Sequence, residues 1–284
     1  MSGTLYLVGT PIGNLGDLSP RAVETLSAVD FIAAEDTRVT LKLLNHFGIK
    51  KPMVSYFEHN RRERGEQIAA RLLAGENCAL VTDAGMPAVS DPGEDLVALC
   101  HGRGIPVHAV PGPAAFVTAL ALSGMPAGRF TFEGFLSVNK RSRREHLASL
   151  ARERRTMLFY EAPHKLPATL RDLNEALGDR RLAIVREITK VHEEVIHTSL
   201  AQAAQDYADS GLRGELVLVV EGAEETAGVI ATLEEATALA HDYQREGCSP
   251  SEAARRAAGE TGLKKGDIYK ALLAQPEEMP DGAL

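Results

Sequence analysis

Apolar and polar positions alternate in blocks along the first half of the chain. Short apolar runs with the length of buried strands occur at residues 5–8, 31–34, 54–57, 78–81 and 107–110. Between them, apolar residues recur every three to four positions, the spacing of one helix face, as in the series Ala22, Val23, Leu26 and Val29. This alternation of strand and helix predicts an α/β fold with a parallel or mixed sheet.

Three loops rich in glycine, proline or small residues follow three of these predicted strands, at residues 9–16, 82–93 and 111–115. Ligands bind at the carboxyl ends of strands in open α/β sheets, and glycine lets a ligand approach the backbone. The first loop is neither GxGxxG nor a P-loop, so a dinucleotide or ATP site is not favoured. The 82–93 loop holds two glycines, two prolines and two aspartates, which favours a ligand loop over an ordinary strand-to-helix connection.

A turn-rich stretch, residues 124–129, separates this half from a second one in which adjacent strands are mixed with helices. From about residue 230 the pattern is helical, and Ser249-Pro250-Ser251-Glu252 predicts a capping box at a helix start. We therefore expect an N-terminal α/β domain over residues 1–123, a second α/β domain over 124–228, a helical extension over 229–275 and a disordered tail over 276–284.

Composition limits the protein class. The 44% hydrophobic and 25% charged residues are typical of a soluble globular protein, and no apolar run reaches the roughly 18 residues of a membrane span. The N-terminus enters a strand without a signal-peptide pattern, so we expect a cytoplasmic protein. Three separated cysteines and nine histidines show no zinc spacing, so we expect no metal site.

The net charge of −8 argues against indiscriminate nucleic-acid coating, but basic residues gather locally. Residues 140–155 hold seven basic side chains against two acidic ones, and a second cluster follows the aromatic and histidine residues at 57–59. Interleaved aromatic and basic side chains suit single-stranded RNA, and a solvated helix face is the alternative. The candidate RNA contacts are Arg38, Arg61, Arg62, Arg141, Arg143, Arg144 and Lys165.

Several motifs occur together in a distinctive order, at residues 5–15, 34–38, 81–93, 110–115, 159–164 and 186–190. With them the chain resembles the tetrapyrrole methylase superfamily, and within it the ribosomal RNA small-subunit cytidine 2′-O-methyltransferases. The resemblance implies two α/β domains with S-adenosylmethionine in the cleft between them, and a homodimer. It also implies 16S ribosomal RNA in the small ribosomal subunit as the partner.

The resemblance further implies which residues hold the cofactor: Pro11, Gly85, Met86, Val89, Ala114, Ala115, Ala162, Glu215 and Leu216. Two positions depart from the superfamily pattern. Met86 stands where ring-methylating relatives have the aspartate of a Gly-Asp-Pro motif, so an aspartate contact to the cofactor is lost there. Lys165 stands where related sequences have arginine, which keeps the charge but not a bidentate phosphate grip.

Transfer of a methyl group to a ribose hydroxyl calls for positioning and for a group that accepts the hydroxyl proton. We expect this acceptor among three carboxylates at predicted strand ends, Asp83, Asp36 and Glu161. For Asp36, a solvated loop with an internal aspartate–arginine pair is the alternative. Two other functions remain open for the whole chain: a precorrin-type tetrapyrrole ring methyltransferase and a non-catalytic RNA-binding module.

Overall fold

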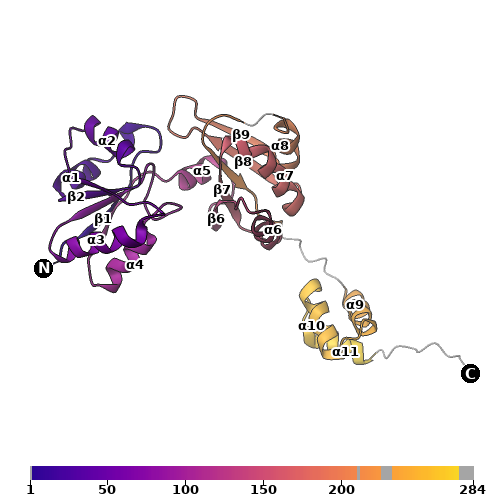
Figure 1. Cartoon of the computed structure of the whole chain (residues 1–284). Coiled ribbons are helices and arrows are strands. Elements are labelled where there is room, and N and C mark those ends of the chain that lie inside the picture. The colour runs from indigo at the N-terminus through magenta and orange to yellow at the C-terminus, as the bar shows by residue number, and fades with distance from the viewer. Residues whose placement is uncertain (1, 210–211, 225–231, 275–284) are drawn as a thin grey trace, which may run out of the picture. The chain divides into compact units, whose positions relative to one another are not determined.

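The computed structural model describes residues 2–209, 212–224 and 232–274 of the chain (Figure 1). The chain forms two compact units, Met1–Ala223 and Glu224–Leu284. The tail predicted over residues 276–284 lies outside the described residues. None of the described helices is long and apolar enough to cross a membrane.

The first sheet has five strands in the order β3-β2-β4-β1-β5, and every neighbouring pair is parallel. Its strands are β1 (Leu5–Val8), β2 (Phe31–Ala34), β3 (Met53–Ser55), β4 (Cys78–Val81) and β5 (Val107–Val110). Its helices are α1 (Pro20–Ala28), α2 (Thr37–His46), α3 (Arg61–Leu73) and α4 (Glu94–Gly102). The alternation of strands and helices predicted from the sequence is confirmed.

Helices cover both faces of this sheet, as the continuous apolar character of its central strands requires. Along β2, Phe31 and Ala33 pack in a cluster with α3 and α4, whereas Ile32 and Ala34 pack with α1 and α2. Successive side chains point to opposite faces of a strand, so both helix pairs gain a buried contact from one strand. The carboxyl ends of the strands are left for the loops that follow them.

The second sheet is mixed, in the order β6-β7-β10-β8-β9; only β6 and β7 pair in parallel. Its strands are β6 (Phe130–Phe135), β7 (Thr156–Glu161), β8 (Arg181–Arg186), β9 (Glu194–Ser199) and β10 (Leu216–Val220). The helices α6 (Lys140–Ser149), α7 (Leu166–Leu177) and α8 (Leu200–Asp206) pack on one face, and α5 (Ala115–Ser123) packs on the other. Helix α5 therefore links the two sheets of the larger unit (Figure 1).

Two helices begin at polar residues that the spacing of apolar residues does not mark. Helix α2 begins at Thr37 because the Asp36 carboxylate accepts a hydrogen bond from the Arg38 N–H, which caps the first turn. Helix α3 begins at Arg61, so Arg61 and Arg62 lie in a helical first turn. The short helix α8 was not predicted, although Ser199 caps it through the Gln202 N–H.

The smaller unit contains α9 (Leu233–Arg245), α10 (Pro250–Thr261) and α11 (Lys265–Ala274), packed around a core rich in alanine. Ser249 caps α10 by accepting the Glu252 N–H, as predicted, but the Glu252 carboxylate pairs with Arg255. The reciprocal capping box occurs one helix earlier, between Thr232 and Glu235. Small alanine side chains let the three helices approach closely with little apolar bulk.

Candidate functional site

A cavity of about 350 Å³ lies in the larger unit where the loops of the first sheet meet the second sheet. It is formed by the loop after β4, the start of α5, the end of β7, the loop after β8 and the start of β10. Its lining residues are Ile12, Ala84, Gly85, Met86, Val89, Ser90, Asp91, Ala114, Ala115, Phe116, Phe135, Tyr160, Glu161, Ala162, Pro163, Ile188, Glu215, Leu216 and Val217. Among these described residues there is no lysine, arginine or histidine.

The glycine loops are joined directly by their backbones. Thr10 and Gly85 exchange two N–H···O=C hydrogen bonds of 2.9 and 3.1 Å, which tie the loop after β1 to the loop after β4. Gly9 lies against Gly112, where a Cβ would come within 2.8 Å of the Gly9 Cα atom. The three glycine-bearing loops predicted from the sequence therefore form one wall, and side chains at Gly9 or Gly112 would force it apart.

Eight of the nine residues expected to hold a cofactor line this cavity: Gly85, Met86, Val89, Ala114, Ala115, Ala162, Glu215 and Leu216. Pro11 is absent from the lining, where its neighbour Ile12 takes part instead. Sequence reasoning missed the aromatic residues Phe116, Phe135 and Tyr160. Their apolar character resembles that of any core residue, so the sequence held no signal to separate them.

Asp36 and Asp83, two of the carboxylates expected to accept a proton, lie outside the lining. Asp36 is bound by Arg38 through side-chain and backbone N–H groups, and these bonds lower the pKa of Asp36 to about 2. Asp83 accepts a hydrogen bond from the Asp36 N–H at 3.2 Å, and burial raises the pKa of Asp83. The aspartate–arginine pair weighed as the alternative for Asp36 is present.

Glu161, the third of these carboxylates, lines the cavity but is already hydrogen-bonded. One oxygen accepts the Ala162 N–H at 2.8 Å, and the other accepts the hydroxyl of Thr169 on α7. Arg143 of α6 donates to the same Thr169 oxygen at 2.9 Å and pairs with Asp172. A continuous network therefore runs from the cavity wall to α6, with Arg143 inside it.

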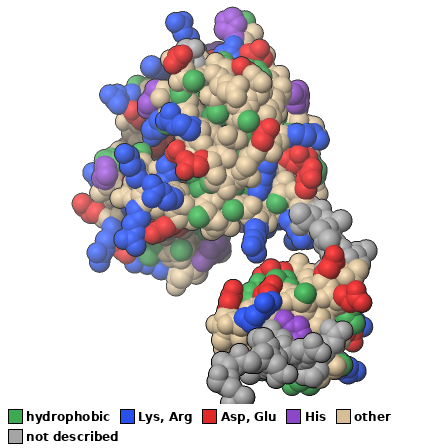
Figure 2. All heavy atoms as spheres, turned by 90° about the vertical axis from the view of Figure 1, so that its right-hand side faces the viewer, with side chains coloured by type: hydrophobic (Ala, Val, Ile, Leu, Met, Phe, Trp, Pro, Cys, Tyr) green, Lys and Arg blue, Asp and Glu red, His purple; other side chains and the backbone are tan. Residues whose placement is uncertain are grey.

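The remaining basic candidates lie at the surface of the larger unit. Arg38 pairs with Asp36, Arg61 with Asp95 and Arg141 with Glu145, while Arg62 and Arg144 are exposed. Lys165 ends the short 3-10 helix Pro163–Lys165, two residues after the cavity-lining Pro163. Figure 2 shows Lys and Arg side chains gathered on one flank of the larger unit, among fewer acidic ones.

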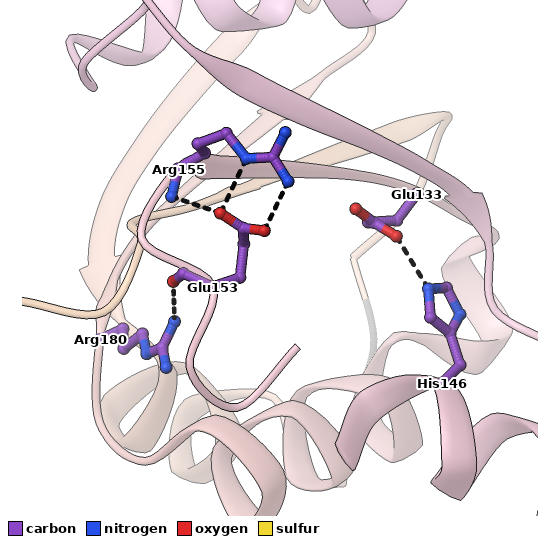
Figure 3. A network of polar contacts seen from close by, with 5 residues as sticks. All are labelled: Glu133, His146, Glu153, Arg155 and Arg180. Carbon is purple, nitrogen blue, oxygen red and sulfur yellow. Dashed lines mark hydrogen bonds and ion pairs between the residues drawn. The ribbon is translucent and has the colours of Figure 1, made fainter. Parts of the chain in front are cut away.

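Some side chains of the basic segment, residues 140–155, form hydrogen bonds and ion pairs within the protein (Figure 3). His146 of α6 lies 2.8 Å from the Glu133 carboxylate on β6, and Arg155 chelates the Glu153 carboxylate. The Arg155 guanidinium lowers the pKa of Glu153 to about 2, while Arg180 donates to the Glu153 carbonyl oxygen at 3.3 Å. The charge offered to a partner is thus smaller than the seven basic residues suggest.

Comparison with known proteins identifies the family to which this chain belongs. The model of the tetrapyrrole (corrin/porphyrin) methylases matches residues 4–204. The chain is 47% identical over 272 residues to ribosomal RNA small subunit methyltransferase I of Synechocystis sp., covering 95% of this chain and 98% of that one. The protein of the same name from Thermotoga maritima is 47% identical over 222 residues, covering 78% of this chain and 100% of that one.

Solved structures agree on the fold. Uroporphyrin-III C-methyltransferase from Thermus thermophilus, in a crystal structure with S-adenosyl homocysteine, superposes with a TM-score of 0.53 at 20% identity, covering 76% of this chain and 97% of that one. At this identity the likeness shows a shared architecture of two α/β halves, as expected from the sequence. Taken with the family match over most of the chain, it places the protein among the tetrapyrrole (corrin/porphyrin) methylases, in the group of the ribosomal RNA small subunit methyltransferase I proteins.

Proposed function

We propose that the protein is an S-adenosylmethionine-dependent methyltransferase that methylates the ribose 2′-hydroxyl of a cytidine in 16S ribosomal RNA of the small ribosomal subunit, in the cytoplasm. The observation that carries the proposal is the cavity where the two sheets meet, in a chain 47% identical to a ribosomal RNA small subunit methyltransferase I. A methyltransferase needs a concave site that encloses its cofactor, and this cavity supplies one.

The residues present fit the proposed cofactor. A cavity of about 350 Å³ is large enough for a nucleoside-sized ligand, and aromatic and small apolar side chains line most of it. Three carboxylates, Asp91, Glu161 and Glu215, line it without any basic side chain, which suits a cationic ligand rather than a phosphate-bearing one. When bound, the cofactor supplies an electrophilic methyl group attached to a positively charged sulfur.

We propose that residues from both sheets bind this cofactor. Gly85, Met86 and Val89 from the loop after β4, with Ala114 and Ala115 at α5, form one wall. Ala162, Glu215 and Leu216 form the opposite wall, and Pro11 supports the first loop beside it. Fixing the cofactor and the hydroxyl in the reactive geometry lowers the activation free energy by up to roughly 7–11 kcal/mol.

The RNA contacts we propose lie on exposed basic side chains rather than in the cavity. Arg62 and Arg144 are the exposed candidates with no ion pair among the described residues, and the half-buried Lys165 follows the cavity-lining Pro163 by two residues. Arg38, Arg61 and Arg141 are themselves exposed, so each can exchange its carboxylate partner for phosphate, because ion pairs at the surface are worth only about 0–1 kcal/mol. Arg143 is the exception, since it is bound inside the network with Thr169 and Asp172.

Methyl transfer to RNA tests the proposal. Purified protein is incubated with S-adenosylmethionine labelled in the methyl group and with small ribosomal subunits from cells lacking the activity, and the labelled nucleoside is mapped after nuclease digestion. Label in one 2′-O-methylated cytidine supports the proposal. Label entering a tetrapyrrole instead overturns the RNA assignment, and RNA binding with no transfer from a bound cofactor overturns the enzymatic one.

We also propose a homodimer, as the resemblance implies. Helix α5 exposes Val117 and Leu122, and Phe116 on the same helix contacts the ring of Phe130, which is itself partly exposed. Exposed apolar side chains grouped on adjacent elements are typical of interaction surfaces. Sedimentation equilibrium tests this part separately: a mass of twice 30.5 kDa supports the dimer, and a monomer at micromolar concentration contradicts it.

A further inference from the structure

Asp91 lies on a part of the cavity wall whose backbone is strained. Its neighbours Ala88 and Ser90 have φ values of 66° and 63°, a region that residues other than glycine rarely adopt. Each such residue costs on the order of 1–3 kcal/mol and persists only where the surroundings impose it. Gly93 closes the loop with φ of 148°, where a Cβ would meet Leu80 and Ala88. The fold therefore presents Asp91 to the cavity on a fixed and costly loop.

Asp91 is surrounded by groups that disfavour its charge. It is half-buried, and it faces Glu35 at the end of β2, Asp83 at the end of β4 and Tyr160 on β7. Burial and the two neighbouring carboxylates raise the pKa of Asp91 to about 6. Arg38 of α2 lowers the pKa of Asp83, but it is bound to Asp36. No cation therefore offsets the charge of Asp91 within the described part of the chain.

The other carboxylates of the cavity are already occupied. Glu161 accepts the Thr169 hydroxyl and the Ala162 N–H, and Glu215 pairs with Lys190 at 3.2 Å. Asp91 accepts no hydrogen bond and forms no ion pair with any described residue. A carboxylate that lines a cavity, is partly desolvated and has free lone pairs is chemically available to a ligand hydroxyl.

We propose that Asp91 accepts the proton of the hydroxyl that is methylated, an inference that rests on the proposed function. In the transfer, the hydroxyl oxygen forms a bond to the methyl carbon, the methyl–sulfur bond breaks, and its electron pair stays on sulfur. The hydroxyl proton passes to the Asp91 carboxylate and from there to solvent. The products are the methyl ether, the neutral thioether and protonated Asp91, so atoms and charge balance.

This assignment replaces the three carboxylates predicted from the sequence. Asp36 is too weak a base with the Arg38 guanidinium bound to it, and Glu161 has both oxygens engaged. Asp83 does not line the cavity, although it lies near enough to raise the pKa of Asp91. Asp83 therefore raises the proton affinity of Asp91 and does not contact the substrate.

The test compares Asp91→Asn with Asp91→Glu and with Asp206→Asn, an exposed aspartate on α8 that serves as the matched control. We expect Asp91→Asn to lower the single-turnover rate of methyl transfer to small ribosomal subunits by roughly 10²–10⁴-fold. Asp91→Glu should restore part of the rate, and Asp206→Asn should leave it unchanged. Calorimetric affinity for S-adenosyl homocysteine should stay within threefold in all three variants.

Two further readouts, the pH profile of the rate and the melting temperature, separate a proton acceptor from a residue with only a structural role. The wild-type rate should rise with pH through a value at or below about 6, and Asp91→Asn should lose this limb. Because the folded pKa of Asp91 lies above the ordinary value of 3.8, its ionisation opposes folding as pH rises from about 4 to about 6. Asp91→Asn should therefore melt at a higher temperature than the wild type at pH 8 but not at pH 4.

Each contrary outcome has its own meaning. An Asp91→Asn rate within threefold of the wild type, with the same pH profile, overturns the assignment of the proton to Asp91. A loss of rate matched by an equal loss of S-adenosyl homocysteine affinity also overturns it, because Asp91 would then bind the cofactor. If the wild-type protein binds cofactor but transfers no methyl group to RNA, the proposed function itself fails.

Discussion

The cavity wall and the basic segment of α6 hold charge in opposite ways. At the cavity, burial and the charges of Glu35 and Asp83 raise the pKa of Asp91, and burial together with Asp83 raises the pKa of Glu35. Along α6, most charged side chains are exposed, and Arg141 forms an exposed ion pair with Glu145. The first arrangement costs folding free energy, whereas the second is nearly neutral. Carboxylates that repel one another beside a cavity are typical of catalytic sites. Exposed basic side chains suit reversible binding to a polyanion such as RNA.

Among the variants that test this comparison, the largest effect should follow from distorting the cavity wall while the basic surface stays intact. In Gly112→Ala, the new Cβ would meet the Gly9 backbone at 2.8–2.9 Å, so the loops after β1 and β5 must separate. We expect affinity for S-adenosyl homocysteine to fall at least tenfold, with RNA affinity within threefold of the wild type. Calorimetry and filter binding measure the two. The control Gly102→Ala adds a Cβ with no atom within 4 Å and should change neither.

Arg143→Ala should lower stability more than it lowers RNA affinity. Its side chain is 14% exposed and bonds both Thr169 and Asp172, so truncation removes the ion-pair partner of the Asp172 carboxylate and a donor to the Thr169 hydroxyl. We expect a loss of about 1–3 kcal/mol in the free energy of unfolding, measured by urea denaturation. Unchanged stability with a large loss of RNA affinity would mean that Arg143 turns outward to the RNA.

Arg144→Ala, one position along α6, should give the opposite result. Arg144 is exposed and has no ion pair among the described residues, so its removal should leave stability within about 0.5 kcal/mol of the wild type. We expect the slope of log affinity against log salt concentration to fall by roughly 0.7–1, as for one lost phosphate contact. Filter binding across a salt series measures this slope, and an unchanged slope would remove Arg144 from the interface.

The smallest effect should come from removing the three-helix unit. The Thermotoga maritima relative matches 222 residues of this chain over its whole length, close to the extent of the larger unit, Met1–Ala223. Ala223 still bonds the Glu153 carbonyl oxygen, so a chain ending there keeps its last contact. We expect this chain to bind S-adenosyl homocysteine within threefold of the full protein. A tenfold loss in calorimetry would show that the smaller unit supports the cavity.

Sequence patterns predicted the backbone of the site better than its electrostatics. Strands β1, β2, β4 and β5 were predicted with their observed bounds, because a buried strand is a short, unbroken apolar run. The ligand loops were found because glycine and proline mark them directly. The start of α2 has no apolar signal, because Asp36, a candidate proton acceptor in the sequence, caps the helix.

Asp91 was overlooked because its importance depends on distant neighbours. It lies in the loop singled out from the sequence, but Glu35 and Tyr160 reach it from β2 and β7. Asp36 and Glu161 were favoured by position at strand ends, and only the structure shows the donors that occupy them. Likewise, nothing along the basic segment separates the bound Arg143 from the exposed Arg144.

The most direct test of the account is a crystal structure of the protein with S-adenosyl homocysteine at saturating concentration. We expect the ligand between Gly85–Asp91 and Ala114–Ala115 on one side and Ala162 and Leu216 on the other. Its sulfur should lie on the side of the cavity that Asp91 faces. Ligand bound elsewhere, with this cavity empty, would contradict the assignment of the cofactor site and the role of Asp91 together.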